Sequence, residues 1–154
     1  MSLPGDKCKV STTYSLKQGD ILFHEGTAAS EMFFIESGKL KITKRVLNRS
    51  IKLGELEEGE FVGELAVLGG GLRSATAQAY TDCKVSTLDK NTCQQCFNTL
   101  PPCMHTLMER LAQRLQQTDE LVVKVARILE IVKGLAEKME MLEDSILEDT
   151  PTNI

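Results

Sequence analysis

Hydrophobic residues follow two different patterns along the chain. From about residue 10 to residue 90, short apolar runs rich in β-branched and aromatic residues alternate with glycine-containing segments. Beyond Pro101 and Pro102, apolar residues recur every three or four positions. Because side chains repeat every two residues in a strand and every 3.6 in a helix, the first part is predicted to be β and the second helical.

Several short segments in the first part are typical of strands. Leu40 and Ile42 alternate with lysine and threonine, which is the pattern of a strand with one solvent-facing side. The predicted strands are residues 21–23, 32–35, 39–43, 76–79 and 85–88. The predicted turns between and beside them contain Gly19, Gly26, Gly38, Gly54 and Gly59. Many short strands with regular turns indicate a jelly-roll sandwich or barrel, a double-stranded β-helix.

The second part is predicted to be one long helix that begins at Pro101–Pro102 and ends before Thr150–Pro151. Gly134 is the one residue within it that disfavours a helix. Its apolar residues are spaced four and three apart and form an unbroken heptad seam. The seam residues are Leu121, Val125, Ile128, Val132, Leu135, Met139, Leu142 and Ile146. Mostly β-branched a positions with mostly leucine at d favour a parallel two-stranded coiled coil, and hence a homodimer. The alternative is a helix packed on its own domain, but so small a β-domain cannot cover about 40 Å of helix.

Composition narrows the class of protein. The chain has no run of about 18 apolar residues and no signal peptide at its N-terminus, so we expect a cytoplasmic protein without a membrane span. Its formal charge of −4 and the absence of tryptophan argue against nucleic-acid binding. The five cysteines form an odd set, and in a cytoplasm we expect them to be reduced thiols: Cys8, Cys83, Cys93, Cys96 and Cys103.

Residues 61–76 carry the candidate chemistry, because one acid, one arginine and a glycine-rich turn lie there between two predicted strands. A cyclic nucleotide offers a ring phosphate, which a guanidinium and backbone N–H groups bind, and a ribose 2′-OH, which donates to a carboxylate. Arg73 and Glu64 are residues of these two types. On spacing alone, a surface ion pair between them beside the triple glycine is the simpler interpretation.

This stretch resembles the phosphate-binding cassette of the cyclic nucleotide-binding domain family, through Phe61, Gly63-Glu64-Leu65-Ala66 and Arg73-Ser74-Ala75-Thr76. Residues 16–26 and 31–40 are similar to the family's first turn and the hairpin after it. Residues 82–89 with Leu100–Pro101 are similar to its last strands and hinge helix. The resemblance covers about residues 14 to 120. It implies a binding domain without catalytic residues, whose ligand is cAMP or cGMP.

The resemblance also implies what each residue does. Glu64 would accept from the 2′-OH, Arg73 would clamp the phosphate, and Gly63 would let the backbone approach the ligand. Leu65 and Ala66 would offer amides at the start of a one-turn helix, and Ser74 a hydroxyl or amide. The predicted ligand-binding residues are Gly63, Glu64, Leu65, Ala66, Arg73, Ser74, Ala75 and Thr118.

Within the family, the chain is most similar to the sensory domain of catabolite activator (Crp/Fnr-type) regulators. Residues 111–118 resemble the start of their dimerisation helix, where a threonine reaches the purine across the dimer. Thr118 is the candidate for that role, and it also falls at an a position of the seam; the alternative is a tolerated polar seam residue. Ser74 and Thr118 together favour cAMP, whereas Asp119 departs from the small hydroxyl residue often found in the activators. No helix-turn-helix follows Ile146, so we expect no DNA-binding domain, in a free-standing sensor or a piece of a longer one.

Together these patterns predict a mainly β protein with C-terminal α structure. Residues 1–100 would form the barrel with its hinge helix, residues 101–149 the dimerisation helix, and residues 150–154 a tail. Ligand binding would draw the hinge helix inward, move the long helix and thereby signal to a partner that the sequence does not identify.

Two other functions remain open from the sequence. A redox- or cofactor-sensing dimer would use the cysteines, and an interaction module would keep only a vestigial pocket. Cys93 and Cys96 form a CxxC motif, but a zinc site needs four ligands and the chain has no second such motif, so no metal is predicted. Cys93, Cys96 and Cys103 are instead interpreted as small buried hydrophobic residues, with a conditional disulfide as the alternative.

Overall fold

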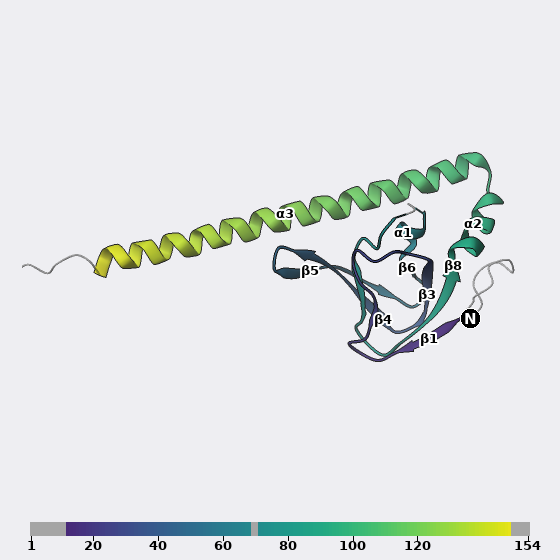
Figure 1. Cartoon of the computed structure of the whole chain (residues 1–154), viewed down its shortest axis with the longest axis horizontal. Coiled ribbons are helices and arrows are strands. Elements are labelled where there is room, and N and C mark those ends of the chain that lie inside the picture. Colours follow the sequence, from purple (N-terminus) through teal and green to yellow (C-terminus); the bar gives the residue numbers. More distant parts are fainter. Residues whose placement is uncertain (1–11, 69–70, 149–154) are drawn as a thin grey trace, which may run out of the picture.

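The computed structural model describes residues 12–68 and 71–148, with side chains up to residue 142. Within these two ranges, eight strands and three helices follow one another (Figure 1). They are β1 (Thr13–Leu16), β2 (Ile21–Phe23), β3 (Glu31–Ser37), β4 (Lys39–Val46), β5 (Arg49–Glu57), β6 (Phe61–Val62), α1 (Glu64–Leu68), β7 (Thr76–Ala79), β8 (Cys83–Asp89), α2 (Lys90–Asn98) and α3 (Pro102–Glu148).

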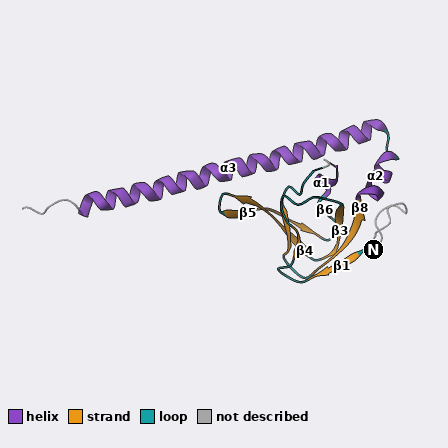
Figure 2. Ribbon diagram, in the orientation of Figure 1, coloured by secondary structure: helices purple, strands orange, loops and turns teal. Residues whose placement is uncertain are grey.

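The strands, drawn in orange in Figure 2, form two four-stranded antiparallel sheets. Their orders are β1-β8-β3-β6 and β2-β7-β4-β5. The alternation seen in the sequence decides which side chains face inward: Leu40 is fully buried, while Lys39 reaches Glu57 on the outside at 2.7 Å. The core between the sheets consists of Phe33, Ile35, Leu40, Val62, Ala77, Ala79, Cys83 and Val85. The predicted jelly-roll fold followed by a long C-terminal helix is therefore confirmed.

One predicted turn is wrong. Gly54 lies inside β5, opposite Ile42 of β4. The register between the two strands shifts there, because Ile42 pairs with Gly54 but Thr43 pairs with Lys52. Leu53 is thus the extra residue of a β-bulge, a place where a glycine in a strand often occurs.

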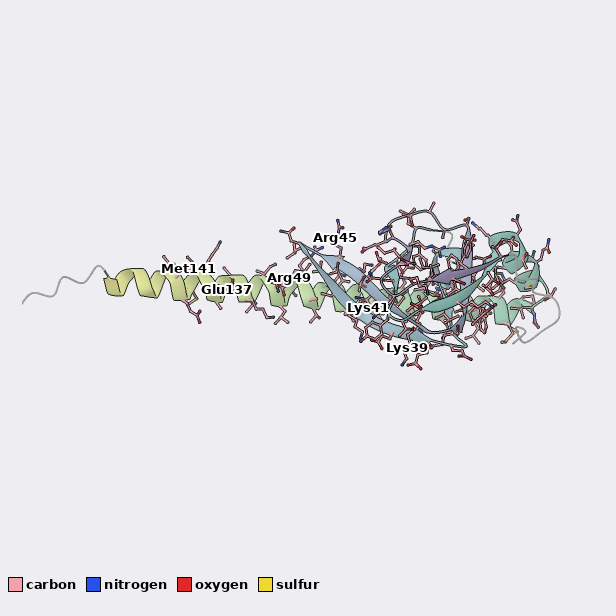
Figure 3. The ribbon with its side chains drawn as sticks, turned by 90° about the horizontal axis from the view of Figure 1, so that it is seen from below. Lys39, Lys41, Arg45, Arg49, Glu137 and Met141 are labelled. Carbon is pink, nitrogen blue, oxygen red and sulfur yellow. The ribbon has the colours of Figure 1, made fainter. Side chains whose placement is uncertain are left out.

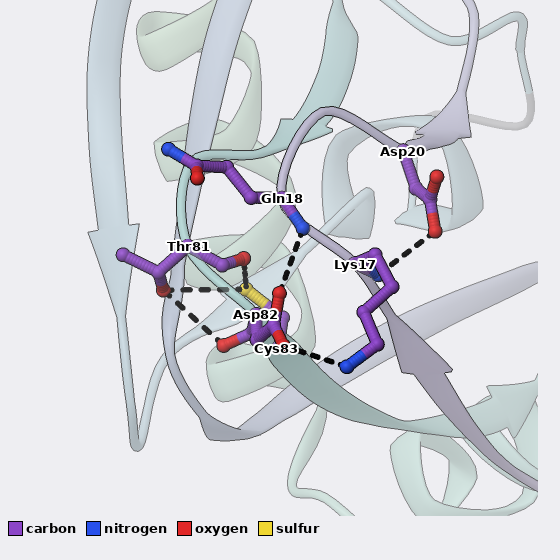
Figure 4. A network of polar contacts seen from close by, with 6 residues as sticks. All are labelled: Lys17, Gln18, Asp20, Thr81, Asp82 and Cys83. Carbon is purple, nitrogen blue, oxygen red and sulfur yellow. Dashed lines mark hydrogen bonds and ion pairs between the residues drawn. The ribbon is translucent and has the colours of Figure 1, made fainter.

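Polar contacts connect the turn that follows β1 with the turn that precedes β8 (Figure 4). Asp82 accepts from the Lys17 ammonium at 2.8 Å and from the backbone N–H of Gln18 at 2.9 Å. The buried thiol of Cys83 donates to the backbone carbonyls of Lys39 and Thr81. Because the ion pair is exposed, the backbone contacts rather than its charges fix this end of the sandwich.

Helix α2 links the sandwich to α3. Asp89 caps its N-terminus by accepting from the backbone N–H of Thr92 at 3.0 Å. Cys93 of α2 is buried in a second cluster with Phe34, Val67 and Leu88. Helix α2 therefore packs against β3, β8 and α1.

Helix α3 runs along the sandwich and continues well beyond it (Figure 1). Half-buried residues on its domain-facing side are Ala112, Asp119, Val123, Ala126 and Glu130. The heptad seam lies on the opposite side, where its members from Leu121 to Leu142 are each 55–65% exposed. The side chain of Ile146 lies outside the described residues. The helix therefore packs on its own domain through a different face and leaves the seam open; the coiled-coil dimer stays a prediction.

Within the described ranges, no helix has both the length and the apolar composition needed to cross a membrane.

Candidate functional site

A pocket lies between the β4–β5 hairpin, α1 and α3. Strands supply Phe23, Ile42, Val62 and residues 53–56 to its lining, and the segment around α1 supplies residues 63–66 and 73–75. Leu115 and Asp119 of α3 close the remaining side. The pocket thus collects a cation, three carboxylates and an apolar surface from six separated segments.

Arg73 is the buried cation of this pocket, and only 5% of the residue is exposed. Its Nη1 donates to the carbonyl of Gly63 at 3.1 Å and its Nη2 to the carbonyl of Glu31 at 2.7 Å. The guanidinium also stacks over Phe23, 4.2 Å from the ring centroid. Burial lowers the pKa of Arg73 from its usual value, although the charges of Glu31 and Glu64 oppose the shift.

Gly63 makes this position of Arg73 possible. It has a φ of +82°, in the left-handed region, and a Cβ at this residue would overlap Nη1 of Arg73. From the sequence we expect Gly63 to leave space for the ligand. In the structure, the guanidinium of Arg73 takes up part of that space.

Glu64 begins α1 and faces the same pocket. Burial raises the pKa of its carboxyl, and the nearby charge of Asp119 raises the pKa further. Its own backbone N–H and Arg73 act in the opposite direction. Burial also raises the pKa of Asp119, while Lys44 on β4 lowers it. Two carboxyls that resist ionisation therefore share one pocket with one guanidinium.

The structure gathers most of the predicted ligand-binding residues in one place. The seven from the 61–76 segment all line this pocket: Gly63, Glu64, Leu65, Ala66, Arg73, Ser74 and Ala75. Thr118 is not among the lining residues of its own chain; it is exposed, and its hydroxyl donates to the carbonyl of Arg114 at 2.9 Å. A contact between Thr118 and a base bound by a second chain stays a prediction.

Sequence reasoning does not assign several of the lining residues to the site. It places Phe23 only in a strand, and it singles out Asp119 only as a departure from the activators' pattern. Asp119 follows Leu115 by about one helical turn, so helical spacing alone would place both on one face. The hairpin residues 53–56 carry no comparable signal, because their place depends on the bulge.

The cysteines do not form a site in the described part of the chain. Cys83, Cys93, Cys96 and Cys103 are not joined in disulfides with one another, and no group of three or more potential metal ligands is found among the described residues. Cys93 is buried as expected, and burial raises the pKa of its thiol. Cys103 is exposed on α3, so its interpretation as a buried residue is wrong, and Cys96 is only partly buried. Cys8 lies outside the described residues.

Comparisons with known proteins agree with this geometry. Among curated proteins, the cAMP-activated global transcriptional regulator CRP of Salmonella typhimurium is 29% identical over 120 residues, covering 77% of this chain and 57% of the relative. The chain thus spans little more than half the length of that relative. Among solved structures, the Thermus thermophilus catabolite activator protein matches with a TM-score of 0.61 and 28% identity, over 75% of this chain and 55% of the other. The cGMP-bound form of the EAL enzyme Bd1971 matches with a TM-score of 0.64 and 28% identity, over 68% and 28%.

A family profile, described as the cyclic nucleotide-binding domain, matches residues 14–99. That range holds both sheets except for Thr13, the first residue of β1, and the whole 61–76 segment, and it makes up more than half of the chain. The chain therefore belongs to the cyclic nucleotide-binding domain family.

Proposed function

We propose that this chain is a non-enzymatic sensor that binds a cyclic nucleotide in the Arg73 pocket and signals as a homodimer through α3. The observation that carries the proposal is the buried guanidinium of Arg73 in a pocket that also contains the carboxylate of Glu64. The binding of a cyclic nucleotide by family members supports the ligand class, and the exposed heptad seam supports the dimer.

The phosphate site follows from the surroundings of the Arg73 guanidinium. None of the ion pairs among the described residues includes Arg73, although its side chain is almost completely buried. Glu31 and Glu64 lie near this cation without forming an ion pair with it, so a cyclic phosphodiester would stabilise the guanidinium by direct contact. The two carbonyl contacts use only two of the five guanidinium N–H donors, which leaves donors for phosphate oxygens.

The sugar site follows from Glu64. An ionised carboxylate only accepts hydrogen bonds, and a ribose 2′-OH is a donor that it can take up. Burial disfavours the ionised form, and a hydrogen bond from the 2′-OH would compensate for that cost. Around both groups, Phe23, Leu65 and Ala66 supply the apolar walls typical of small-molecule sites.

Two nucleotides compete for the base site. Ser74 and Thr118 favour cAMP, by the resemblance to the activators. Asp119 favours cGMP as the second candidate, because its carboxylate lines the pocket and guanine offers an N1–H and an N2 amino group as adjacent donors. Adenine offers one amino group beside a ring nitrogen that repels a carboxylate.

Signalling would proceed by a shift between two positions of α3. Leu115 and Asp119 belong to α3, so a ligand in the pocket contacts the signalling helix directly. A ligand shifts the equilibrium only as far as its affinities for the two positions differ. The downstream partner would read the geometry of the coiled coil.

Calorimetric titration with cAMP, cGMP and linear AMP tests the ligand. The cyclic nucleotides are expected to bind, and AMP, with its larger phosphate charge and free end, to bind far more weakly. Absence of heat and of thermal stabilisation with both cyclic nucleotides would overturn the proposal. An absorbance spectrum and a thiol count of the purified protein test the redox-sensing alternative in the same sample.

A further inference from the structure

A second cavity lies where α1, α2 and the first turns of α3 meet, at the end of the sandwich from which α3 starts (Figure 1). Its volume is about 140 Å³. A cavity of about 150 Å³ in another protein holds a benzene molecule, so there is room here for a small ring. Among the described residues, none lines both this cavity and the Arg73 pocket.

One part of the cavity wall is apolar. It is formed by Val67 and Leu68 of α1, Phe97 of α2 and Met108 of α3, all of them at least partly buried. The ring of Phe97 meets the ring of His105 edge to face, with their centroids 6.2 Å apart. Such a wall is typical of small-molecule sites and favours a ligand with an apolar body.

The open side of the cavity carries exposed polar residues, which are Lys90, Gln94 and Glu109. Glu109 has a partner already, because Nδ1 of His105 lies 3.3 Å from its Oε1. Lys90 takes part in none of the ion pairs found within the described ranges. Since the acid is paired and the lysine is not, the charges at this opening favour an anionic group on the ligand.

The cavity stays accessible in the proposed dimer. Counting heptads back from Thr118 puts Leu107 and Leu111 on the seam, where they are 49% and 53% exposed. The same count puts His105 and Glu109 at b and f positions, on the other side of the helix. A second copy bound at the seam would therefore leave the opening free.

We propose that this cavity binds a monocarboxylate whose apolar body is about the size of a benzene ring. The carboxylate would pair with Lys90 and accept from the side-chain amide of Gln94. The ring or branched chain would lie against the apolar wall. This binding does not depend on the proposed nucleotide site, because the two cavities have different linings.

The two cavities nevertheless share helix α1. Residues 64–66 line the nucleotide pocket, and Val67 and Leu68 line this cavity. Nucleotide binding is expected to draw α2 inward, which would narrow a cavity that lies between α1 and α2. A bound carboxylate would oppose that movement and weaken nucleotide binding, and the nucleotide would weaken carboxylate binding by the same factor. This coupling, unlike the binding itself, rests on the proposed function.

Benzoate is the probe for the site, because it combines a ring of suitable size with a carboxylate. Titration of the full chain with ¹³C-labelled methionine methyl groups, followed by NMR, reports on the cavity through Met108, whose signal is assigned with Met108→Leu. We expect a saturable shift with a dissociation constant of about 1 mM or lower. Benzylamine has the same ring with the opposite charge and should bind at least about tenfold more weakly.

A charge variant locates the binding. Lys90→Gln changes an exposed side chain, so the fold should remain while benzoate affinity falls at least about fivefold. The matched control is Lys133→Gln, at an exposed position of α3 outside the lining, which should leave the affinity unchanged. The dependence on Lys90 also separates this site from the Arg73 pocket. Absence of a saturable Met108 shift, or equal affinities of the wild type and Lys90→Gln, would overturn the proposal.

The coupling is measured by titrating the cyclic nucleotides with and without saturating benzoate. We expect their dissociation constants to rise at least about fivefold in the wild type and much less in Lys90→Gln. Unchanged constants, or an equal rise in both chains through competition at the Arg73 pocket, would overturn the coupling. A chain that binds benzoate but neither cyclic nucleotide would overturn the proposed function alone.

Discussion

The guanidinium of Arg73 fills the space beside Gly63 that any larger residue there would need. A Cβ at Gly63 would overlap Nη1, while the carbonyl of Gly63 accepts from the same atom at 3.1 Å. The glycine thus both makes room for the arginine and holds it, which ties the backbone conformation at residue 63 to the phosphate site.

Replacing Gly63 should damage stability and binding together. We expect Gly63→Ala to lower the free energy of unfolding by about 1–3 kcal/mol, through strain at φ +82° and the overlap with Arg73. Displacement of the guanidinium should weaken nucleotide binding as well. Gly19→Ala is the control, because Gly19 has a φ of +96° but a Cβ there would meet no atom within 4 Å. Chemical unfolding and calorimetry measure the two effects; equal losses of affinity in both variants would contradict the coupling.

Arg73 itself should not be replaceable by lysine. An ammonium keeps the charge but cannot reach the carbonyls of Gly63 and Glu31 together or stack on Phe23 as a plane. We expect Arg73→Ala to weaken binding by about 2–4 kcal/mol, or about 30- to 1000-fold, and Arg73→Lys to recover only a small part. Calorimetry gives the affinities, and thermal unfolding checks that each variant is folded. A lysine variant that binds as tightly as the wild type would show that the site needs a positive charge but not a guanidinium.

The fold can be predicted from the sequence because its strands are short runs rich in apolar residues that are separated by turn residues. The predicted strands 21–23 and 76–79 agree with the structure to the residue, the first as a continuous apolar run and the second as an alternating one. Strand β5 escapes such a prediction because the bulge at Leu53 shifts its alternation, so Ile51, Leu53 and Leu56 do not stay in one phase. Gly54 then resembles a turn residue.

The site can be predicted only where it is local in sequence. Gly63, Glu64 and Arg73 lie within eleven residues of one another, so a family pattern contains them all. Asp119 and Phe23 reach the pocket only through the packing of α3 and β2, which no local pattern specifies. For the same reason the sequence does not predict the exposure of Cys103: it depends on which side of α3 meets the domain.

Glu64 should lower the stability of the unliganded protein at neutral pH. Burial raises the folded-state pKa of this carboxyl above its unfolded value. Its contribution to stability is then fully present below the unfolded pKa and is lost as the pH rises through the folded pKa. We therefore expect Glu64→Gln to be more stable than the wild type near pH 7, with the difference shrinking towards about pH 4. Urea unfolding between these limits measures it.

The same substitution should weaken nucleotide binding, because glutamine is a poorer acceptor for the 2′-OH than a carboxylate. A gain in stability with a loss of affinity is the expected signature of a binding group. Glu58→Gln, at an exposed position outside the pocket lining, should change neither property. If Glu64→Gln were less stable than the wild type at every pH, burial would not be the dominant effect on this carboxyl.

The seam should decide the oligomeric state. Leu135→Asp would place two like charges face to face in a parallel coil, and we expect it to convert a dimer into a monomer. Met141→Asp is the matched control, since Met141 is on the same helix (Figure 3) and is 72% exposed, but its position in the heptad is not part of the seam. Light scattering distinguishes the two states. A dimeric Leu135→Asp chain would locate the interface elsewhere.

Asp119 should select between the two purines. Its carboxylate lines the pocket from α3, and guanine would offer it two adjacent N–H donors, whereas adenine would set a ring nitrogen against it. We expect Asp119→Ala to reduce cGMP affinity by about 1–3 kcal/mol, the discrimination typical of a bidentate contact, and to leave cAMP affinity unchanged or higher.

The pH dependence gives an independent check of the same contact. Because burial raises the pKa of Asp119, the preference for cGMP should decline as the pH falls through that raised value, and Asp119→Ala should abolish this dependence. Competition titrations with both nucleotides over a range from mildly acidic to neutral pH would measure the ratio directly. Equal changes in the two affinities on substitution would show that Asp119 supports the position of α3 rather than the base, and discrimination would then fall to Ser74 and Thr118.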